Sequence, residues 1–464
     1  MRWKKLMGLS GVIGASICGA CLAKTCSRSD WILGRVSAEA DDPRATVTHS
    51  MSGLKLRQVQ VFFRHGARTP LNTTHGIEEV AYPSDIALRT VPHTVFKYEV
   101  VVLPDWRLKC NVSDLELHYK KTQLKGGGYA GILTTYGQQQ MYELGARLRN
   151  LYIKKKKLVS PDYNPMDVVQ STDMSRTIGS ARCVLAGLFG KQSLNKNGPV
   201  IIPVSESDDE ILFPNSKVCS VLKKANHAAM IHYDHIPGMR KDREKVEEVL
   251  GYDPAEPHKV SFLALRDDLI ARVTHGYSVP DCLAPYMDMI DRNATKMIYY
   301  AMTGQHDAER PIVTRLSAGP AMYKALDSMR RARDGKKTPK IFLYSTHDSL
   351  MVALLESLGL FDWQWPPFGA DFRLELYRDR EGEHWVRVLY LGQEKTIRGC
   401  DSPLVHFDEF ERILEPYTID RGGDFDQICA SGVLEEIAAT LLEHDQDEVE
   451  TDEIKEKSEI PAGM

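Results

Sequence analysis

Three short apolar stretches of the chain each end abruptly at charged or polar residues. Residues 59–63 are rich in Val and Phe, residues 166–170 contain two valines, and residues 340–345 read Lys-Ile-Phe-Leu-Tyr-Ser. Runs of this length and composition are typical of buried β-strands. We therefore predict three strands. In an open α/β sheet, the residues that directly follow such strands lie at the edge where ligands bind.

Helical periodicity follows each predicted strand. Apolar residues recur at helical spacing over 137–152, over 178–188 and over 349–358, and Gly190 and Gly359 are positioned to end the last two helices. Residues 171–173, Ser-Thr-Asp, are N-cap candidates for the second helix. A further helix is predicted over 319–333, and a hairpin over 372–377 and 386–391. The pattern indicates an α/β protein with a mixed, mainly parallel sheet flanked by helices.

The remaining stretches suggest how the chain is organised. Residues 71–128 contain many Pro and Gly, which predicts a long irregular excursion, and residues 191–311 predict helices without another strand-to-motif junction. We predict an α/β core from residues 54–190 and 312–430, with a helical cap inserted at 191–311 to which loop 71–128 contributes. The acidic tail, 440–464, is predicted to be disordered.

Two local features leave alternatives open. The lysines of residues 154–157 fit the solvated C-terminal end of a helix, although a lipid-binding patch is the other interpretation. The aromatic stretch 363–368 belongs either to the core or, in part, to the lining of a pocket.

Size and charge restrict the classes of function. The chain has 464 residues, 43% of them hydrophobic, which is enough to bury a large core. Its net charge of -4 gives no general attraction to nucleic acid or to anionic membranes, so any phosphate binding has to be local. The charged C-terminus also argues against a membrane anchor there.

The first 40 residues predict a targeting leader. They begin with basic residues, continue with an apolar stretch over 6–23, and contain no acidic residue before Asp30. Both a secretory signal and a mitochondrial presequence fit this pattern, and three Asn-X-Ser/Thr sequons fit secretion. Six cysteines follow the leader without metal-ligand spacing, so disulfides and isolated buried thiols are both open: Cys110, Cys183, Cys219, Cys282, Cys400 and Cys429.

The first junction has the composition of an anion site. Arg64 and Arg68 are charged forks that match phosphate oxygens, and His65 between them is suited to nucleophilic or acid–base work near neutral pH. Gly66 is expected to let the backbone turn and a ligand approach closely. The alternative is a surface loop with scattered charges.

The other two junctions supply further candidates. Arg176 falls in the first turn of the second predicted helix, where free amides and a guanidinium would both attract phosphate. A solvent-facing arginine is the alternative for this residue. His347 and Asp348 follow the third predicted strand directly.

These residues carry a family resemblance. Residues 64–70, Arg-His-Gly-Ala-Arg-Thr-Pro, resemble the signature of the histidine acid phosphatases, and residues 171–177 are similar to the family's second motif. Gln170 departs from the pattern, because relatives commonly have an arginine there. The resemblance implies a phosphoglycerate-mutase-like fold with a smaller, mostly α-helical cap, and a monomer that needs no cofactor.

The resemblance also implies roles for the candidates. His65 would attack phosphorus to form a phosphohistidine, and Asp348 would protonate the leaving oxygen. Arg64, Arg68, Arg176 and His347 would bind the phosphate. Asp348 has to start protonated, which requires an environment that raises its pKa or an acidic medium. His227, His232 and His235 lack a plausible fourth ligand, so we predict no metal site.

Residues 124–131, 137–149 and 365–368 are similar to the branch of this family that acts on lysophosphatidic acid. This likeness implies hydrolysis of lysophosphatidic acid to monoacylglycerol and phosphate, and a mitochondrial address. The alternatives are a broad-specificity or phytase-like phosphatase of the secretory pathway and an inactive phosphate-binding module.

Overall fold

A mixed β-sheet forms the centre of the computed structural model, which describes residues 53–164, 168–231, 233–253, 255, 260–437 and 439. Its strands lie in the order β10-β8-β7-β1-β6-β4-β5-β2-β3, and β9 pairs with β8. The neighbours from β1 to β2 in this order pair in parallel, and the outer pairs are antiparallel. The strands are β1 (Lys55–Arg64), β2 (Tyr98–Leu103), β3 (Arg107–Leu108), β4 (Val168–Ser171), β5 (Val200–Ser205), β6 (Ile341–Thr346), β7 (Asp371–Arg378), β8 (His384–Tyr390), β9 (Gln393–Lys395) and β10 (Leu404–His406).

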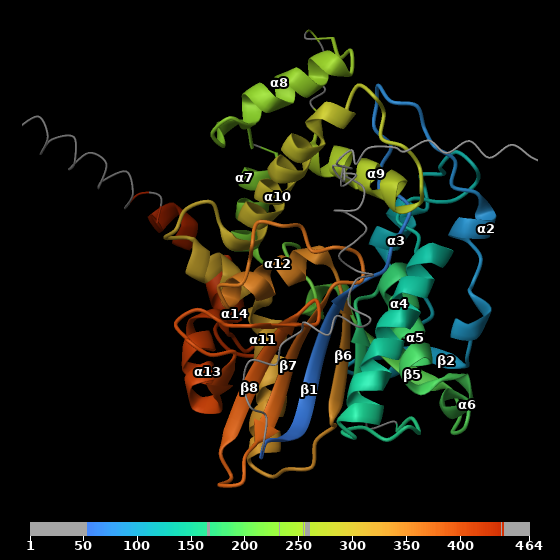
Figure 1. Ribbon diagram of the computed structural model, residues 1–464. Helices are drawn as coiled ribbons and strands as arrows, with labels where there is room; N and C mark the ends of the chain where they lie inside the picture. Colours follow the sequence, from blue (N-terminus) through green and yellow to red (C-terminus); the bar gives the residue numbers. More distant parts are fainter. Residues whose placement is uncertain are drawn as a thin grey trace, which may run out of the picture.

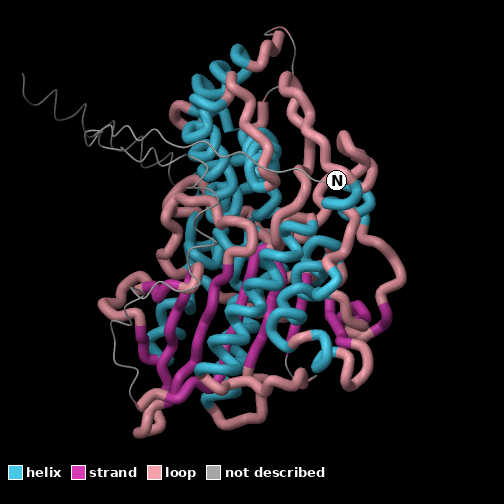
Figure 2. The backbone as a smooth tube through the Cα atoms, turned by 45° about the vertical axis from the view of Figure 1, so that its right-hand side comes forward, coloured by secondary structure: helices cyan, strands magenta, loops and turns pink. Residues whose placement is uncertain are grey.

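Strand β1 lies inside the sheet, and apolar side chains on both of its faces are buried. Val59, Val61 and Phe63 face one helical layer, and Phe62 faces the other, because successive side chains of a strand point to opposite faces. A strand covered on both sides has no solvent-exposed face, which explains why most of its side chains are apolar. Gln58 and Gln60 are also buried there, and their side chains are hydrogen-bonded. Figure 2 shows the strands running side by side between the helices.

Helices cover both faces of the sheet. On one face, α4 and α5 pack on Val61 and Phe63, and a π-helical turn continues α4. On the other face, α11 and α12 contact β1, and α13 contacts β8 and β10; their apolar side chains share one buried cluster with Phe62. These elements are α4 (Thr135–Leu148), the π-helical turn (Arg149–Lys155), α5 (Ser175–Phe189), α6 (Lys191–Leu194), α11 (Arg310–Arg333), α12 (Asp348–Ser357) and α13 (Phe407–Leu414).

A group of helices above the sheet has an apolar core of its own. Phe262, Leu265, Leu269, Ile290 and Met297 are buried there. Figure 1 shows this group above the sheet, with α8 farthest from it. The helices are α8 (Met239–Val249), α9 (Phe262–Thr274) and α10 (Met287–Thr303). Helix α7 (Ser220–Met230) packs against α10, but its buried side chains belong to other apolar clusters.

Short elements complete the chain. A disulfide between Cys219 and Cys429 ties the start of α7 to α14, and both cysteines are buried. Cys110, Cys183, Cys282 and Cys400 are free thiols. The short helices are α2 (Ser84–Ala87), α3 (Asp114–Tyr119) and α14 (Phe425–Ala430), and 3₁₀ turns form at Pro92–Thr94, Ser207–Asp209, Tyr233–His235, Ala284–Tyr286 and Glu415–Tyr417.

The predicted fold class is confirmed, as are the three strands and the helices that follow them. The excursion over 71–128 was wrongly predicted to be irregular, because it contains β2, β3, α2 and α3. The stretch 191–311 was predicted to be a mostly helical cap, yet it includes β5, which belongs to the central sheet and pairs with β2 and β4. Strand β5 is a short run of Val and Ile, which periodicity alone does not separate from a buried helix segment.

Two helix starts also differ from prediction. Met174, not residues 171–173, is the N-cap of α5, and its side chain makes no capping hydrogen bond. Helix α11 begins at Arg310, nine residues before the predicted start, and continues through Gly319 and Pro320. In a sequence, Gly followed by Pro is a signal that breaks a helix, so the predicted helix did not extend to Arg310. Gly319 lets the segment that contains Tyr417 lie close to α11, because a Cβ at this position would be 3.0 Å from the Tyr417 carbonyl oxygen.

The predicted leader (1–40) and tail (440–464) lie outside the described residues. Within the described part of the chain, no helix has the length and apolar character needed to cross a bilayer. The division into core and cap remains a prediction.

Candidate active site

The three predicted junctions meet at one edge of the sheet. Strands β1, β6 and β4 are parallel, and their register places Arg64 opposite Thr346 and Ser171 opposite Ser345. The residues that follow these strand ends therefore converge. The rings of His65 and His347 are 5.5 Å apart, and the His347 Nε2 lies 2.9 Å from the Thr172 hydroxyl oxygen.

His65 is buried, and the hydrogen-bond partner of Nδ1 shows which ring nitrogen carries the proton. Its Nδ1 lies 2.9 Å from the carbonyl oxygen of Gly66, which can only accept, so Nδ1 carries the proton. The Nε2 lone pair is then free. Burial and the positive charges of Arg176, Arg64 and Arg68 hold the pKa of His65 well below its ordinary value. The imidazole is therefore neutral and nucleophilic at neutral and mildly acidic pH.

Gly66 has a different role from the predicted one. A Cβ on Gly66 would lie 2.4 Å from the Gly137 carbonyl oxygen, and a Cβ on Gly137 would lie 2.0 Å from the Ala67 carbonyl oxygen. The two glycines let α4 press against the turn after β1. The space beside Gly66 is thus filled by helix α4 and not left open for a ligand, which corrects the expectation from sequence.

Three buried arginines surround the histidines: Arg64, Arg68 and Arg176. The Nε of each has no hydrogen-bond partner, and neither has the Nη1 of Arg176. The guanidinium of Arg176 lies 5.3 Å from the ring centre of Tyr119 on α3, a cation–π contact that leaves its donors unused. Buried donors without partners are costly. The cluster therefore has both the charge and the free donors to bind an anion.

Asp348 faces the same centre. Its Oδ2 lies 2.7 Å from the Arg64 Nη2 and accepts a hydrogen bond from the Trp365 Nε1 at 3.0 Å. Burial acts to raise the pKa of Asp348, but the positive charges of Arg64 and Arg68 outweigh it, so the pKa lies below its ordinary value. The mechanism expected from the sequence requires either an environment that raises the pKa of Asp348 or an acidic medium. The structure does not provide the first of these.

His347 is buried beside Asp348. Burial, followed by the charge of Arg176, holds the pKa of His347 well below its ordinary value, so this ring is also neutral. A neutral imidazole can still donate one N–H to a phosphate oxygen without adding charge.

The sequence left open whether the aromatic stretch 363–368 belongs to the core or, in part, lines a pocket. Phe368 lies under the guanidinium of Arg64, 4.2 Å from its Cζ, and 5.8 Å from the His65 ring. Trp365 contacts Asp348 as described above. Trp363 is largely exposed and packs on Tyr299, 4.6 Å away. Part of the stretch therefore lines the site.

Sequence reasoning missed one charged residue of the site. Asp267 on α9 pairs with Arg68 through two hydrogen bonds, of 2.7 and 3.2 Å. It lies 199 residues along the chain from Arg68 and has no motif around it, so no local signal pointed to it. Gln170 lies beneath the site within β4, where its side-chain oxygen accepts a hydrogen bond from Lys324.

Among the described residues, no group of His, Cys, Asp and Glu has the arrangement of a metal site. His235 contacts Gln305, and His232 lies outside the described residues.

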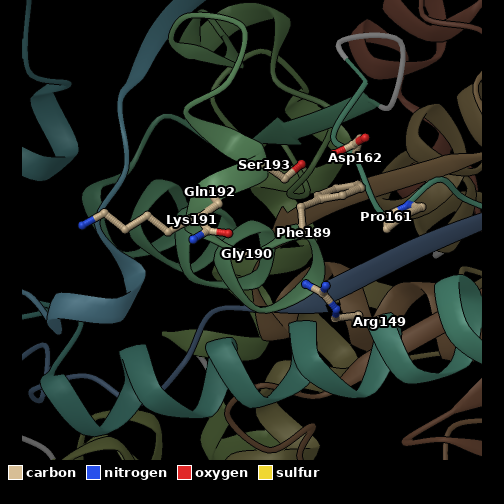
Figure 3. Close-up of a pocket in the computed structure, with 8 residues that line it drawn as sticks. All are labelled: Arg149, Pro161, Asp162, Phe189, Gly190, Lys191, Gln192 and Ser193. Atoms are coloured by element: carbon tan, nitrogen blue, oxygen red, sulfur yellow. The ribbon is translucent and has the colours of Figure 1, made fainter.

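A separate hollow of about 440 Å³ lies at the far end of α5. Figure 3 shows Arg149 and Asp162 on opposite sides of it, with Phe189 between them in this view. Helix α5 has 15 residues, so its ends are about 22 Å apart, and the hollow is distant from Arg176 at the other end. None of the predicted site residues lines it.

Comparisons with known proteins agree with this geometry. The sequence pattern of the histidine phosphatase superfamily (branch 2) matches residues 55–391. Lysophosphatidic acid phosphatase type 6 of Homo sapiens is 36% identical over 374 residues, which are 79% of this chain and 84% of that protein. Prostatic acid phosphatase of Mus musculus is 23% identical over 305 residues, 62% of this chain and 77% of that protein.

Among solved structures, the apo form of Hafnia alvei phytase is similar, with a TM-score of 0.51 and 14% sequence identity. The match covers 80% of this chain and 98% of that one. At this identity the likeness concerns the fold alone.

Proposed function

The chain belongs to branch 2 of the histidine phosphatase superfamily, and on that premise we propose how its site hydrolyses phosphate monoesters. Membership makes the protein a histidine acid phosphatase. The roles of individual residues and the choice of substrate are our proposals.

The first step transfers the phosphoryl group to His65. The phosphate oxygens lie among Arg64, Arg68 and Arg176, and the free Nε2 of His65 attacks phosphorus in line. A bond forms between Nε2 and phosphorus while the bond to the ester oxygen breaks. Asp348 gives its proton to that oxygen, which leaves as an alcohol.

The second step regenerates the enzyme. The Asp348 carboxylate takes a proton from water, and the resulting hydroxide attacks phosphorus and displaces the His65 nitrogen. Inorganic phosphate forms and the imidazole returns to its neutral state. His347 donates a hydrogen bond to a phosphate oxygen in both steps.

The observation that carries this mechanism is the set of unused buried donors on the three arginines. An anion with several oxygens would satisfy them, and a neutral ligand would not. The test is hydrolysis of p-nitrophenyl phosphate by the wild type and by His65→Ala. We expect the variant to be inactive while binding inorganic phosphate, and full turnover by the variant would overturn the assignment of the nucleophile.

We propose lysophosphatidic acid as the substrate, hydrolysed to monoacylglycerol and phosphate. The 36% identity to lysophosphatidic acid phosphatase type 6 supports this choice. A second support is a set of exposed apolar side chains on α3 and the β2–β3 hairpin, namely Trp106, Leu108, Leu115 and Leu117. Helix α3 also carries Tyr119, which contacts Arg176, so apolar surface lies next to the phosphate-binding residues.

Contact with these apolar side chains would distinguish a lysolipid substrate from an inositol phosphate. A lysolipid brings apolar surface together with its phosphate and gains from contact with them, whereas inositol hexakisphosphate has no apolar part. The experiment compares lysophosphatidic acids of several chain lengths with inositol hexakisphosphate. We expect Leu115→Asn with Leu117→Asn to slow hydrolysis of the long-chain lipids and to leave p-nitrophenyl phosphate turnover unchanged. Preference for the inositol substrate would favour the phytase-like alternative.

We propose a mitochondrial address for the leader, on the likeness to the relatives that act on lysophosphatidic acid. The disulfide between Cys219 and Cys429 supports the secretory alternative, because disulfides persist in oxidising compartments. Fusion of residues 1–40 to a fluorescent protein tests the two: mitochondrial fluorescence supports the first and secretion the second.

A further inference from the structure

The contacts of Arg68 restrict how its guanidinium can face a ligand. A guanidinium has five N–H donors. Asp267 accepts from Nη1 at 3.2 Å and from Nη2 at 2.7 Å, and the carbonyl oxygen of Thr69 accepts from Nη1 at 3.0 Å. These contacts use three donors.

The two donors that remain lie on one edge of the group. They are Nε–H, which is buried without a partner, and the second N–H of Nη2. These two N–H bonds are nearly parallel in a planar guanidinium, so they form a fork that matches two oxygens of one phosphate. Asp267 binds the edge of the guanidinium formed by Nη1 and Nη2, so the edge formed by Nε and Nη2 stays free.

Asp267 is itself held firmly. Its Oδ2 also accepts a hydrogen bond from the Leu71 backbone N–H at 2.7 Å. It lies on α9, whose Leu265 and Leu269 are buried in the core of the helical group above the sheet. In Figure 1, α9 is seen above α3 and α4, and His275 at its end contacts the hydroxyl of Thr134, the N-cap of α4. The orientation of Arg68 is therefore set by a helix far away in the sequence.

We propose that Asp267 is a positioning residue, which turns the free side of Arg68 toward the phosphate of the substrate. This inference rests on the proposed function, in which Arg68 binds phosphate. Without the Asp267 carboxylate, the end of the guanidinium is free to rotate, and its fork no longer matches the phosphate bound among the other two arginines.

The alternative is an ion pair that only stabilises the fold. The neighbouring residue provides a matched control, since Asp268 makes a bidentate pair with Arg272, at 2.9 and 3.3 Å, within the same helix. Asp268 also accepts a hydrogen bond from a backbone N–H of the same loop, that of Thr74. Neither Asp268 nor Arg272 contacts the candidate site residues.

The experiment measures kcat and KM for p-nitrophenyl phosphate and the inhibition constant of inorganic phosphate, for Asp267→Asn and Asp268→Asn. Each variant's folded fraction is measured by urea unfolding. We expect Asp267→Asn to lower kcat/KM by about 10- to 100-fold, as a misplaced binding group does, and to weaken phosphate inhibition. Asp268→Asn should lose stability while kcat/KM per folded molecule stays within about 3-fold.

A second comparison keeps the proposal testable if Asp267→Asn folds poorly. In an Arg68→Lys background, the ammonium has no fork to orient, so Asp267→Asn should have little further effect on kcat/KM. Equal losses in both backgrounds, or equal losses for the two aspartate variants, would overturn the proposal. Failure of the proposed function is a separate result, because it would appear as turnover by His65→Ala.

Discussion

Replacing Asp348 with Asn tests the acid catalyst directly. The two side chains have the same shape, but the amide cannot give a proton to a leaving oxygen. We expect the effect to depend on the leaving group. Hydrolysis of an alkyl phosphate such as glycerol phosphate releases a strongly basic alkoxide that needs the proton, whereas p-nitrophenolate is a weak base and leaves without it.

The expected loss of rate is that of general acid catalysis, and the expected loss of stability follows from the contacts of Asp348. General acid catalysis contributes about 10²- to 10⁴-fold, so the kcat of the alkyl phosphate should fall by about that factor, and that of p-nitrophenyl phosphate by less than about 10-fold. Two donors, from Arg64 and Trp365, converge on Oδ2, and the Ser349 N–H donates to Oδ1 at 3.0 Å. An amide can accept from only one of these sides, so the variant should lose about 1–3 kcal/mol of stability and remain folded.

The assay compares single-turnover rates for both substrates with the free energy of unfolding in urea. Single turnovers separate phosphoryl transfer from hydrolysis of the phosphohistidine, in which Asp348 has a second role. If Asp348→Asn slowed both substrates equally in the transfer step, Asp348 would not be the acid at the leaving group, and the assignment would have to be abandoned.

Three further predictions concern the surroundings of the site. Gly137→Ala places a Cβ 2.0 Å from a backbone oxygen of the turn after β1 and should lose more than about 2 kcal/mol of stability in urea unfolding, whereas Gly179→Ala, which meets only a flexible leucine at 3.0 Å, should be nearly neutral. Trp365→Phe removes a hydrogen bond that favours the charged form of Asp348, so the pKa should rise and the alkaline limb of the kcat/KM profile should move to higher pH; a shift to lower pH would contradict this sign. Binding of sulfate, a dianion that does not itself titrate at mildly acidic pH, should be accompanied by uptake of up to about one proton, measured by calorimetry in buffers of different ionisation enthalpy, and uptake should be absent in Asp348→Asn.

The sequence located the charged centre because its residues directly follow buried strands. In parallel strands the residues after each carboxyl end lie at one edge, so the apolar runs before His65 and His347 were enough to predict that the two side chains approach each other. Helical periodicity after the second strand placed Arg176 in the first turn of α5, although the predicted N-cap residues were wrong.

The partners of the centre could not be found in this way. Asp267 lies in the middle of an amphipathic helix, where an acidic residue is most often solvated, and only the packing of α9 over the loop after β1 brings it to Arg68. Gly66 was misread for a related reason. Its neighbour is a helix nearly 70 residues further along the chain, and a local pattern cannot distinguish a glycine that faces a ligand from one that faces a backbone.

The low pKa of Asp348 is compatible with its role as an acid once the charge of the whole centre is considered. Three guanidinium groups, of Arg64, Arg68 and Arg176, face two carboxylates, of Asp348 and Asp267, which leaves one positive charge that favours the ionised form of Asp348. A phosphate monoester dianion would turn this into one negative charge in a buried site, and protonation of Asp348 would remove it. The dianion would also compete with Asp348 for the donors of Arg64. Substrate binding would thereby raise the pKa of the group that has to deliver the proton, so the acid would be prepared only when a phosphate is present, and a moderately acidic medium would complete its protonation.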